Sequence, residues 1–548
     1  MRRPPAIMGA ILGALNSLPF IALDYLGRQW AGLPFVPFDV FDWLARVLPG
    51  RTVSVGIDAI VRLIIILGLG PIDSAAKQIE QLLGVAFVVA GAGLLGAVIV
   101  LIMRRTNWRG ELVGAATGMA TFLVVSAVDM ELRAPISVHP ALGLLWLLLV
   151  IVGWGASLGA WLGSRELGEI GGGVTAGVRR DRRDFVFKIA GACLGAALAT
   201  WGLTRLTKMG PRAAGARRDL PPPHGATLEQ GGGEARAAQS EPASSVEPAS
   251  MRGAFAPAPG TRPEITSSSD FYRIDIDTLP PVIEEDSWAL EVSGLFDRPR
   301  RLTLSDLLAF PAVTQPATLS CISNPIGGDL IGTSNWTGVP LRVVLGHLGL
   351  RPDAWTLSIK AADGFYETVT REDMMDPRTL LVYGMDGKTL PVDHGFPLRI
   401  YIPNRYGMKQ PKWIVSMEAL SRPASGYWED RGWSMEARPH IVSIIDTAAK
   451  DRMQDGKVPI GGIAWAGDRG IQKVEIQVDG GAWATARLRT PPLGPLTWVL
   501  WRCDWPLARG RHVFRVRATD GTGKLQSGIE KGAYPDGATG YHSVAVRI

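Results

Sequence analysis

Residues 317–341 read ATLSCISNPIGGDLIGTSNWTGVPL, and Cys321 is the one cysteine among them. The apolar run before it is typical of a strand, and Gly327 and Gly328 after it are typical of a tight loop. A lone cysteine in such a loop can be a nucleophile, a single soft metal ligand or a buried structural thiol, because a thiolate both attacks carbon and binds soft or high-valent metals. The residue type alone leaves these alternatives open.

The motifs around Cys321 resemble the molybdopterin-binding domain of the sulfite oxidase family. In that family the active-site cysteine is followed by two glycines and then by Trp-Thr-Gly-Val-Pro-Leu, which stands here at Trp336–Leu341. The family order continues at residues 362–366, 383–387, 390–391, 394–397 and 407–413. The resemblance runs from about Phe271 to the C-terminus and implies that Cys321 is the ligand of a molybdenum that a pterin dithiolene also holds.

The same resemblance implies roles for other residues. Tyr383 matches an active-site tyrosine whose phenol can donate a hydrogen bond or a proton to an oxo group. Arg273 matches an arginine near the substrate anion, which a planar guanidinium can bind bidentately. The further cofactor contacts that it implies are Phe271, Tyr272, His394, Arg405, Lys409 and Lys412, the last three cations facing the pterin phosphate. From the residues alone, a packed tyrosine, a surface arginine and a solvated basic loop remain open alternatives.

One departure from the family concerns the substrate. Sulfite oxidases place an arginine five residues after the cysteine ligand, whereas this chain has Ile326 there. One anion-binding cation is therefore missing. Both sulfite oxidation and the reduction of an oxo compound stay open, the second resembling the periplasmic methionine sulfoxide reductases of the same superfamily.

The N-terminal part contains five apolar stretches long enough to cross a hydrocarbon core of about 30 Å as helices: Ile7–Leu23, Gly84–Met103, Leu112–Val128, Ala141–Gly163 and Ile189–Thr204. A sixth stretch, Val55–Gly70, carries Asp58 and Arg62 and is predicted to be an interfacial amphipathic helix. Five crossings with the N-terminus inside place the arginines of residues 2–3, 104–109 and 179–183 on the cytoplasmic side.

The stretch Arg182–Lys188, RRDFVFK, directly precedes the last apolar run and resembles a twin-arginine export signal. A cytoplasmic flank alone would also explain the arginines. Because a molybdenum cofactor is inserted in the cytoplasm, the domain that holds it must cross the membrane folded, which is what that pathway does. We therefore expect a multi-pass protein of the cell membrane with its catalytic domain on the outer face.

Composition argues against several other functions. A net charge of +6 is modest for 548 residues, so nucleic-acid binding is not expected. The three cysteines form no Cys-x-x-Cys pair, and His-x-x-x-His does not occur, so zinc, iron–sulfur and c-type haem signatures are absent. The membrane part has only His139, whereas a bis-histidine haem needs two. We therefore expect no haem in this chain and a separate electron-transfer partner.

The sequence predicts a multi-domain chain in four segments. Residues 1–208 form a transmembrane α-helical bundle, and residues 209–263, rich in Pro, Gly, Ala and Ser, are predicted to be a disordered linker. Residues 264–436 mix short strands and helices, as in an α+β domain, which the resemblance makes the catalytic domain. Residues 437–548 alternate like strands and contain Asp-Gly turns, which predicts an immunoglobulin-like β-sandwich through which two chains could pair.

The interpretation that follows is a membrane-anchored molybdenum oxidoreductase that transfers one oxygen atom to or from a small substrate. The competing hypothesis is a non-catalytic, membrane-tethered binding or scaffold protein that keeps the fold without the metal. A transporter is disfavoured because no apolar stretch carries a central pair of charged residues.

Overall fold

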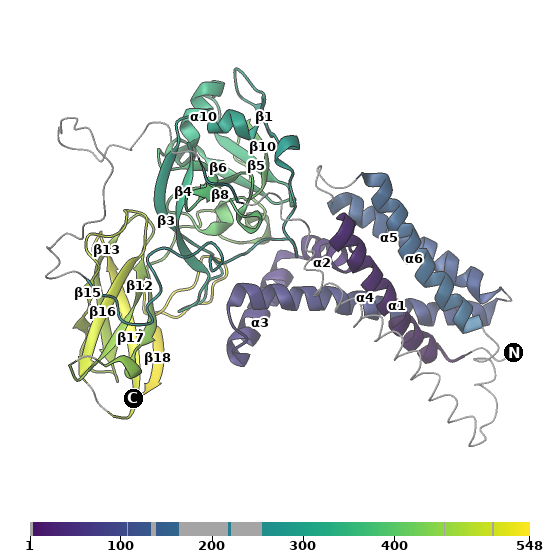
Figure 1. Ribbon diagram of the computed structural model, residues 1–548, viewed down its shortest axis with the longest axis horizontal. Coiled ribbons are helices and arrows are strands. Elements are labelled where there is room, and N and C mark those ends of the chain that lie inside the picture. Colours follow the sequence, from purple (N-terminus) through teal and green to yellow (C-terminus); the bar gives the residue numbers. More distant parts are fainter. Residues whose placement is uncertain are drawn as a thin grey trace. The chain divides into compact units, whose positions relative to one another are not determined.

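The computed structural model describes residues 4–106, 108–132, 139–163, 217–220, 255–453, 455–506 and 509–548 (Figure 1). Its internal contacts divide the chain into two units. The helical unit comprises Met1–Ala216, Asp275–Ser287 and Ala362–Phe365, and the sheet unit comprises Arg217–Ile274, Trp288–Ala361 and Tyr366–Ile548. The two predicted soluble domains thus form one unit, and residues 275–287, expected in the catalytic domain, group with the helices.

The helical unit contains the helices α1 (Ala6–Ala31), α2 (Val36–Val47), α3 (Gly50–Leu67), α4 (Ile72–Arg105), α5 (Gly110–Leu132) and α6 (Pro140–Gly163). Four of these, α1, α4, α5 and α6, are long and apolar enough to cross a membrane. They contain the first four predicted spans. The fifth, Ile189–Thr204, and the twin-arginine-like stretch lie outside the described residues.

Helix α3 covers most of the stretch predicted to be interfacial. It carries Arg51, Asp58 and Arg62 along 18 residues, and it is not among the helices apolar enough to span. Most of its residues are exposed. Its position at a membrane surface stays a prediction.

Glycines let the long helices of this unit approach closely. A Cβ at Gly9 of α1 would lie 2.5 Å from the carbonyl oxygen of Gly96 on α4, and a Cβ at Gly155 of α6 would lie 2.4 Å from that of Gly114 on α5. Neither distance is tolerable for a real side chain. The small residues therefore form the α1–α4 and α5–α6 contacts, as their abundance in the apolar stretches predicted.

The segment Asp275–Ser287 is held within the helical unit by charged groups. Lys77 of α4 pairs with Asp275 at 3.2 Å, and Arg46 of α2 pairs with Asp277 at 2.6 Å. The buried Asp42 accepts hydrogen bonds from the backbone nitrogen and hydroxyl of Thr278. These groups satisfy one another, so the segment can pack on the helices without burying an unpaired charge.

The sheet unit begins with two sheets. One has the strand order β2-β1-β10-β5-β6, and the other has the order β3-β4-β7-β8 with β9 paired to β7. The strands are β1 (Leu290–Gly294), β2 (Arg301–Leu302), β3 (Val313–Ser320), β4 (Ile331–Pro340), β5 (Thr356–Ala361), β6 (Tyr366–Thr370), β7 (Leu380–Met385), β8 (Lys388–Thr389), β9 (Arg399–Tyr401) and β10 (Ile414–Leu420). Among these described strands, only β1 and β10 pair in parallel.

Short helices connect these strands: α9 (Leu304–Leu308), α10 (Leu341–Leu348), α11 (Arg371–Met375), η3 (Val392–His394), η4 (Gly407–Lys409) and η5 (Glu429–Arg431). Helices α9 and α10 agree with the short helices expected in residues 264–436. Helix α9 starts with a capping box, because Thr303 and Asp306 each accept a hydrogen bond from the other's backbone nitrogen.

The C-terminal part contains two antiparallel sheets, β11-β12-β16-β15 and β14-β13-β17-β18. The strands are β11 (Val442–Ala448), β12 (Lys457–Trp465), β13 (Ile471–Val478), β14 (Ala484–Thr485), β15 (Arg487–Leu488), β16 (Val499–Pro506), β17 (Arg511–Asp520) and β18 (His542–Arg547). Side chains of both sheets, such as Ile460 and Val516, share one buried core. The strand alternation is confirmed, and the immunoglobulin-like topology stays a prediction.

Two stretches of the predicted linker are ordered on the sheet unit. Residues 217–220 lie along the β7–β8 hairpin. Residues 255–263 lie on the C-terminal sheets, where Ala258 is buried and Arg262 pairs with Asp446 at 2.7 Å. These stretches differ from the expected tether because each finds partners far away in the sequence. The remaining linker residues lie outside the described residues.

Candidate functional site

Cys321 lies in the loop between β3 and β4. Its backbone nitrogen donates to the carbonyl oxygen of Leu330 at 2.9 Å, and its own carbonyl accepts from Asn324. The side-chain oxygen of Asn324 accepts from the Leu330 nitrogen at 3.0 Å and closes the loop. The sulfur lies 3.0 Å from the hydroxyl of Ser323. The loop therefore holds the thiol at the end of a strand in a defined orientation.

The Cys321 thiol is 7% exposed. Burial raises its pKa above the ordinary value, although the Ser323 hydroxyl and nearby backbone groups oppose the shift. A buried neutral thiol of this kind is a poor nucleophile at neutral pH. A soft metal ion that replaces the proton would compensate the negative charge of the thiolate, which burial otherwise disfavours.

Two predicted cofactor residues, Phe271 and Tyr272, lie beside this loop. A Cβ at Gly407 would lie 3.1 Å from the Tyr272 hydroxyl and 3.9 Å from the Cα of Cys321, so these residues meet around Gly407. The rings of Phe271 and Tyr272 stack at 5.4 Å, and Phe271 meets the rings of Trp336 and His394 edge-on at 5.5 Å each. The structure thus brings Phe271, Tyr272, His394 and Cys321 together, and their contact with a cofactor stays a prediction.

His394 is buried, and its Nε2 lies 3.0 Å from the carbonyl oxygen of Ser268. Since a carbonyl only accepts, Nε2 carries the proton. Burial, together with the charges of Lys412, Arg399 and Arg273, lowers the pKa of His394 to about 3, although the hydrogen bond with Ser268 opposes the shift. The imidazole is therefore neutral and faces three cations.

Two of these cations, Arg273 and Lys412, were predicted from the sequence. Arg273 pairs with Asp393 at 3.4 Å. The ammonium of Lys412 donates to the carbonyl oxygen of Asp393 at 3.1 Å and lies 4.3 Å from the centre of the Trp413 ring. Both therefore lie at the same turn as His394.

The third cation, Arg399 on β9, was not predicted. It is 4% exposed, donates to the carbonyl oxygen of His394 at 3.2 Å and lies over Trp336 at 4.8 Å. Among the described residues no carboxylate pairs with it, and burial lowers its pKa to about 10. The sequence could have indicated Arg399 as a candidate anion-binding residue. It stands within the apolar run Leu398–Ile402, and arginine is seldom buried without an anionic partner.

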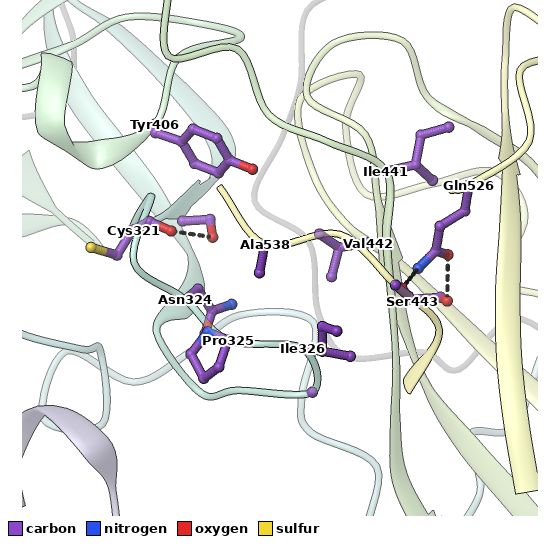
Figure 2. A pocket seen from close by; sticks show the side chains of 13 residues that line it. Cys321, Asn324, Pro325, Ile326, Tyr406, Ile441, Val442, Ser443, Gln526 and Ala538 are labelled. Atoms are coloured by element: carbon purple, nitrogen blue, oxygen red, sulfur yellow. Dashed lines mark hydrogen bonds between the residues drawn. The ribbon is translucent and has the colours of Figure 1, made fainter. Parts of the chain in front are cut away.

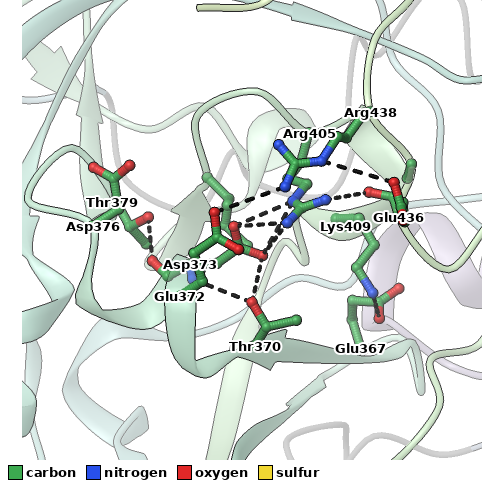
Figure 3. A network of polar contacts seen from close by, with 12 residues as sticks. Glu367, Thr370, Glu372, Asp373, Asp376, Thr379, Arg405, Lys409, Glu436 and Arg438 are labelled. Atoms are coloured by element: carbon green, nitrogen blue, oxygen red, sulfur yellow. Dashed lines mark hydrogen bonds and ion pairs between the residues drawn. The ribbon is translucent and has the colours of Figure 1, made fainter.

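Arg405 and Lys409 lie among carboxylates (Figure 3). Arg405 pairs with Asp373 at 3.1 Å and donates to the carbonyl oxygen of Glu436. Lys409 lies between Glu367, at 2.6 Å, and Glu429. Both are buried, and their donors are engaged by carboxylates. Their contact with a phosphate stays a prediction, and a bound anion would have to displace these pairs.

Tyr383 lies on β7 and is 4% exposed. Burial raises its pKa above the ordinary value. Its phenol makes no hydrogen bond within the part of the chain that the structure describes, which leaves it able to donate to a bound group. Its catalytic role stays a prediction.

A small pocket lies beside the Cys321 loop (Figure 2). The loop and the C-terminal sheets both line it: Ser320, Cys321, Asn324, Pro325, Ile326, Gly327, Tyr406, Ile441, Val442, Ser443, Gln526, Ala538 and Gly540. In Figure 2 the sulfur of Cys321 points away from the other lining residues. Ile326, which stands where sulfite oxidases carry an arginine, lines this pocket, and its terminal carbon lies against Gly540.

Comparison with known proteins agrees with this geometry. Residues 277–428 match the family model of the oxidoreductase molybdopterin binding domain. A protein-methionine-sulfoxide reductase subunit, YedZ1, of Azospira oryzae is 35% identical over 28% of this chain and 56% of its own length. The sulfite oxidase of Arabidopsis thaliana is 28% identical over 42% of this chain and 71% of its own. The sulfane dehydrogenase SoxCD of Paracoccus pantotrophus is 23% identical, with a TM-score of 0.46, over 52% of this chain and 81% of that one.

The family-model match and the curated relatives identify the chain as an oxidoreductase with a molybdopterin-binding domain. It belongs to the sulfite oxidase family. The match to the Azospira protein spans little more than half of that relative's length.

The residues around Cys321 fit a molybdenum cofactor. The described residues contain no group of three or more His, Cys, Asp or Glu that could hold a metal ion. A metal at Cys321 would therefore need most of its ligands from a bound group, and a pterin dithiolene provides two. The buried Arg399, without a carboxylate partner, fits the anionic part of such a group.

Proposed function

We propose that this protein is a membrane-anchored oxidoreductase that transfers one oxygen atom, with two electrons, between a small substrate and a molybdenum bound at Cys321. The observation that carries the proposal is the buried thiol of Cys321 in the same cluster as Tyr272, His394 and the carboxylate-free cation Arg399. When bound, the cofactor supplies the oxo group and accepts or releases the electron pair.

The chain's own residues bind the cofactor, orient the substrate and exclude water. Cys321 supplies one sulfur ligand, and Arg399 with Lys412 neutralises the anionic pterin. Phe271, Tyr272 and His394 form an aromatic wall that keeps water away, which strengthens the electrostatic contacts inside. Tyr383 and Arg273 orient the substrate, Tyr383 through its unengaged phenol.

Ile326 supports an uncharged oxo compound, such as a sulfoxide, over the sulfite dianion. In the sulfite oxidases that this chain resembles, an arginine at this position adds a cation for the substrate anion, whereas isoleucine adds none. The preference follows from that resemblance, because the Cys321 sulfur points away from the pocket that Ile326 lines. The Azospira relative is named as a sulfoxide reductase subunit, and the Arabidopsis relative is named as a sulfite oxidase. The direction of transfer thus separates two candidate reactions of one site.

The apolar helices support anchoring in a membrane. We propose that the catalytic part faces outward, that a separate protein exchanges electrons with it, and that two chains pair through the C-terminal sheets. The twin-arginine-like stretch and the absence of a second membrane histidine motivate the first two proposals.

The decisive test is metal content and oxygen transfer of the full chain, purified from a host that makes molybdopterin. We expect about one molybdenum per chain, as one thiolate site requires. Turnover should occur with methionine sulfoxide and a reduced dye or with sulfite and an oxidised dye. Cys321→Ser should abolish turnover, whereas Cys503→Ser, on strand β16, should leave it unchanged.

A chain free of molybdenum from such a host would overturn the enzyme proposal and favour the tethered scaffold. Equal turnover of the wild type and Cys321→Ser would exclude Cys321 as the ligand. A wild type that turns over only sulfite would refute the role given to Ile326 while leaving the enzyme intact.

A further inference from the structure

Residues Arg217–Leu220, here called the strap, pair with the β7–β8 hairpin as an additional edge segment. Asp219 and Lys388 form an antiparallel bridge. The backbone nitrogen of Leu220 donates to the carbonyl oxygen of Gly387 at 3.0 Å, and that of Thr389 donates to Arg218 at 2.9 Å. The strap thus covers the open edge of β8, which would otherwise expose unpaired backbone groups.

Arg217 joins this hairpin to a second segment. Its Nε donates to the carbonyl oxygen of Thr389 at 3.0 Å, and its Nη2 donates to that of Met385 at 2.6 Å. Its Nη1 donates to the hydroxyl of Ser268 at 2.7 Å. One guanidinium therefore connects the two ends of the β7–β8 turn to Ser268, with the rigid geometry that a lysine cannot reproduce.

Both connected segments carry residues of the candidate site. On one side, Ser268 holds the Nε2 of His394 through its carbonyl oxygen and precedes Phe271 and Tyr272 by a short turn. On the other side, Met385 ends the strand that carries Tyr383. The Leu220 side chain also lies against Gly384, because a Cβ there would lie 2.1 Å from its terminal carbon.

We propose that Arg217 is a positioning residue. Through the strap it holds the aromatic segment at 268–272 and the Tyr383 strand at the separation that the cofactor and substrate require. The consequence for turnover rests on the proposed function, whereas the effect on the two segments does not. No group of the strap touches Cys321 in the described contacts, so Arg217 acts through its neighbours.

The test is hydrogen–deuterium exchange of the full chain in detergent, which reports local opening. In Arg217→Ala we expect exchange at residues 266–272 and 385–389 to speed up by about tenfold, as the loss of one or two charge-assisted hydrogen bonds implies. Exchange in β17 should stay as in the wild type. Arg217→Lys should fall between the two, and Leu220→Ala should loosen residues 385–389 only.

The matched control is Arg218→Ala. Arg218 is the exposed neighbour of Arg217, and its backbone nitrogen donates to the hydroxyl of Thr389, a hydrogen bond that the substitution keeps. This variant should exchange as the wild type does. In loaded enzyme, kcat per bound molybdenum should fall several-fold in Arg217→Ala and stay unchanged in Arg218→Ala.

Wild-type exchange at both segments in Arg217→Ala would overturn the proposal, as would faster exchange spread equally over β17. Normal kcat per molybdenum with loosened segments would remove the positioning role and leave a structural strap. If the wild type binds no molybdenum, the proposed function fails while the exchange data still decide whether Arg217 couples the two segments.

Discussion

Arg399 illustrates how a single buried charge can mark a binding site. Transfer of an unpaired guanidinium into a protein interior is unfavourable, and stacking on Trp336 with one carbonyl acceptor compensates only part of that cost. A bound anion would complete the compensation. The residue therefore reduces the stability of the empty site and increases its affinity for an anionic cofactor.

Arg399→Gln should therefore bind molybdopterin more weakly than the wild type. The variant should retain several-fold less molybdopterin than the wild type after gel filtration, because a charge-assisted hydrogen bond contributes roughly 1.5–3 kcal/mol. Pterin released from the protein can be quantified by fluorescence. Arg301→Gln, an exposed arginine on β2, is the control and should retain the wild-type amount. Equal retention in both variants would show that Arg399 does not contact the pterin.

Glu367 should make the stability of the protein depend on pH. It is fully buried, shares Lys409 with Glu429, and its Oε2 has no hydrogen bond among the described residues (Figure 3). Burial raises the pKa of Glu367 to about 7, although Lys409 opposes the shift. Because the folded pKa lies above the unfolded value, the fold favours the protonated form. Its contribution is complete below pH 4.5 and is lost as the pH rises through 7.

Glu367→Gln, which stays neutral, should therefore lose less stability than the wild type between about pH 5 and pH 8. The difference should be on the order of 2 kcal/mol across that window. Chemical unfolding followed by tryptophan fluorescence at several pH values measures it. Glu291→Gln, at an exposed position, should parallel the wild type. Parallel curves for all three proteins would mean that Glu367 titrates normally.

At the scale of elements, the helices of the N-terminal part depend on contacts between backbones. A stripe of glycines on α5 faces a matching stripe on α6, so any side chain there meets a carbonyl oxygen of the other helix. Without a hydrophobic driving force between helices in lipid, this close approach supplies the packing energy.

Gly155→Val should accordingly destabilise the α5–α6 pair. Its Cβ would lie 2.4 Å from the Gly114 carbonyl oxygen, and overpacking of this kind costs about 1–3 kcal/mol. The thermal midpoint of the full chain in detergent should fall by several degrees. Gly91→Val is the matched control on α4, because no atom lies within 4 Å of its Cβ. A drop of the same size in both variants would point to helix propensity instead of packing.

The strands and short helices of the sheet unit were largely predictable. Val474, Ile476 and Val478 alternate in the sequence and point into one core, and Thr303 with Asp306 starts α9 where the sequence changes. Such signals are local, since side-chain alternation and capping involve residues a few positions apart. Helix α4 extends beyond the apolar stretch Gly84–Met103, because the more polar residues before that stretch continue the same helix.

At the scale of the whole molecule, contacts between distant residues decided what the motifs could not. The basic loop at 405–412 suggested three phosphate ligands, yet Arg405 and Lys409 meet Asp373 and Glu367 from strands and helices far earlier in the chain. A cation shows its charge in the sequence but not its partner. The same holds for residues 217–220. Their composition predicts a coil, and only the edge of the β7–β8 hairpin gives them a strand-like partner.

The sequence by itself determined the apolar helix lengths, the alternating strands, the lone Cys321 in its glycine-rich loop and the order of motifs that indicates a molybdopterin domain. These depend on residue type and on spacing over a few positions, which any fold must respect. Only the tertiary structure decided that Arg399 is the buried cation beside His394, that Arg405 and Lys409 are neutralised, and that Arg217 spans two segments of the site. Each of these outcomes depends on which distant groups share a low-dielectric space, where pairing and desolvation outweigh the properties of the isolated side chain.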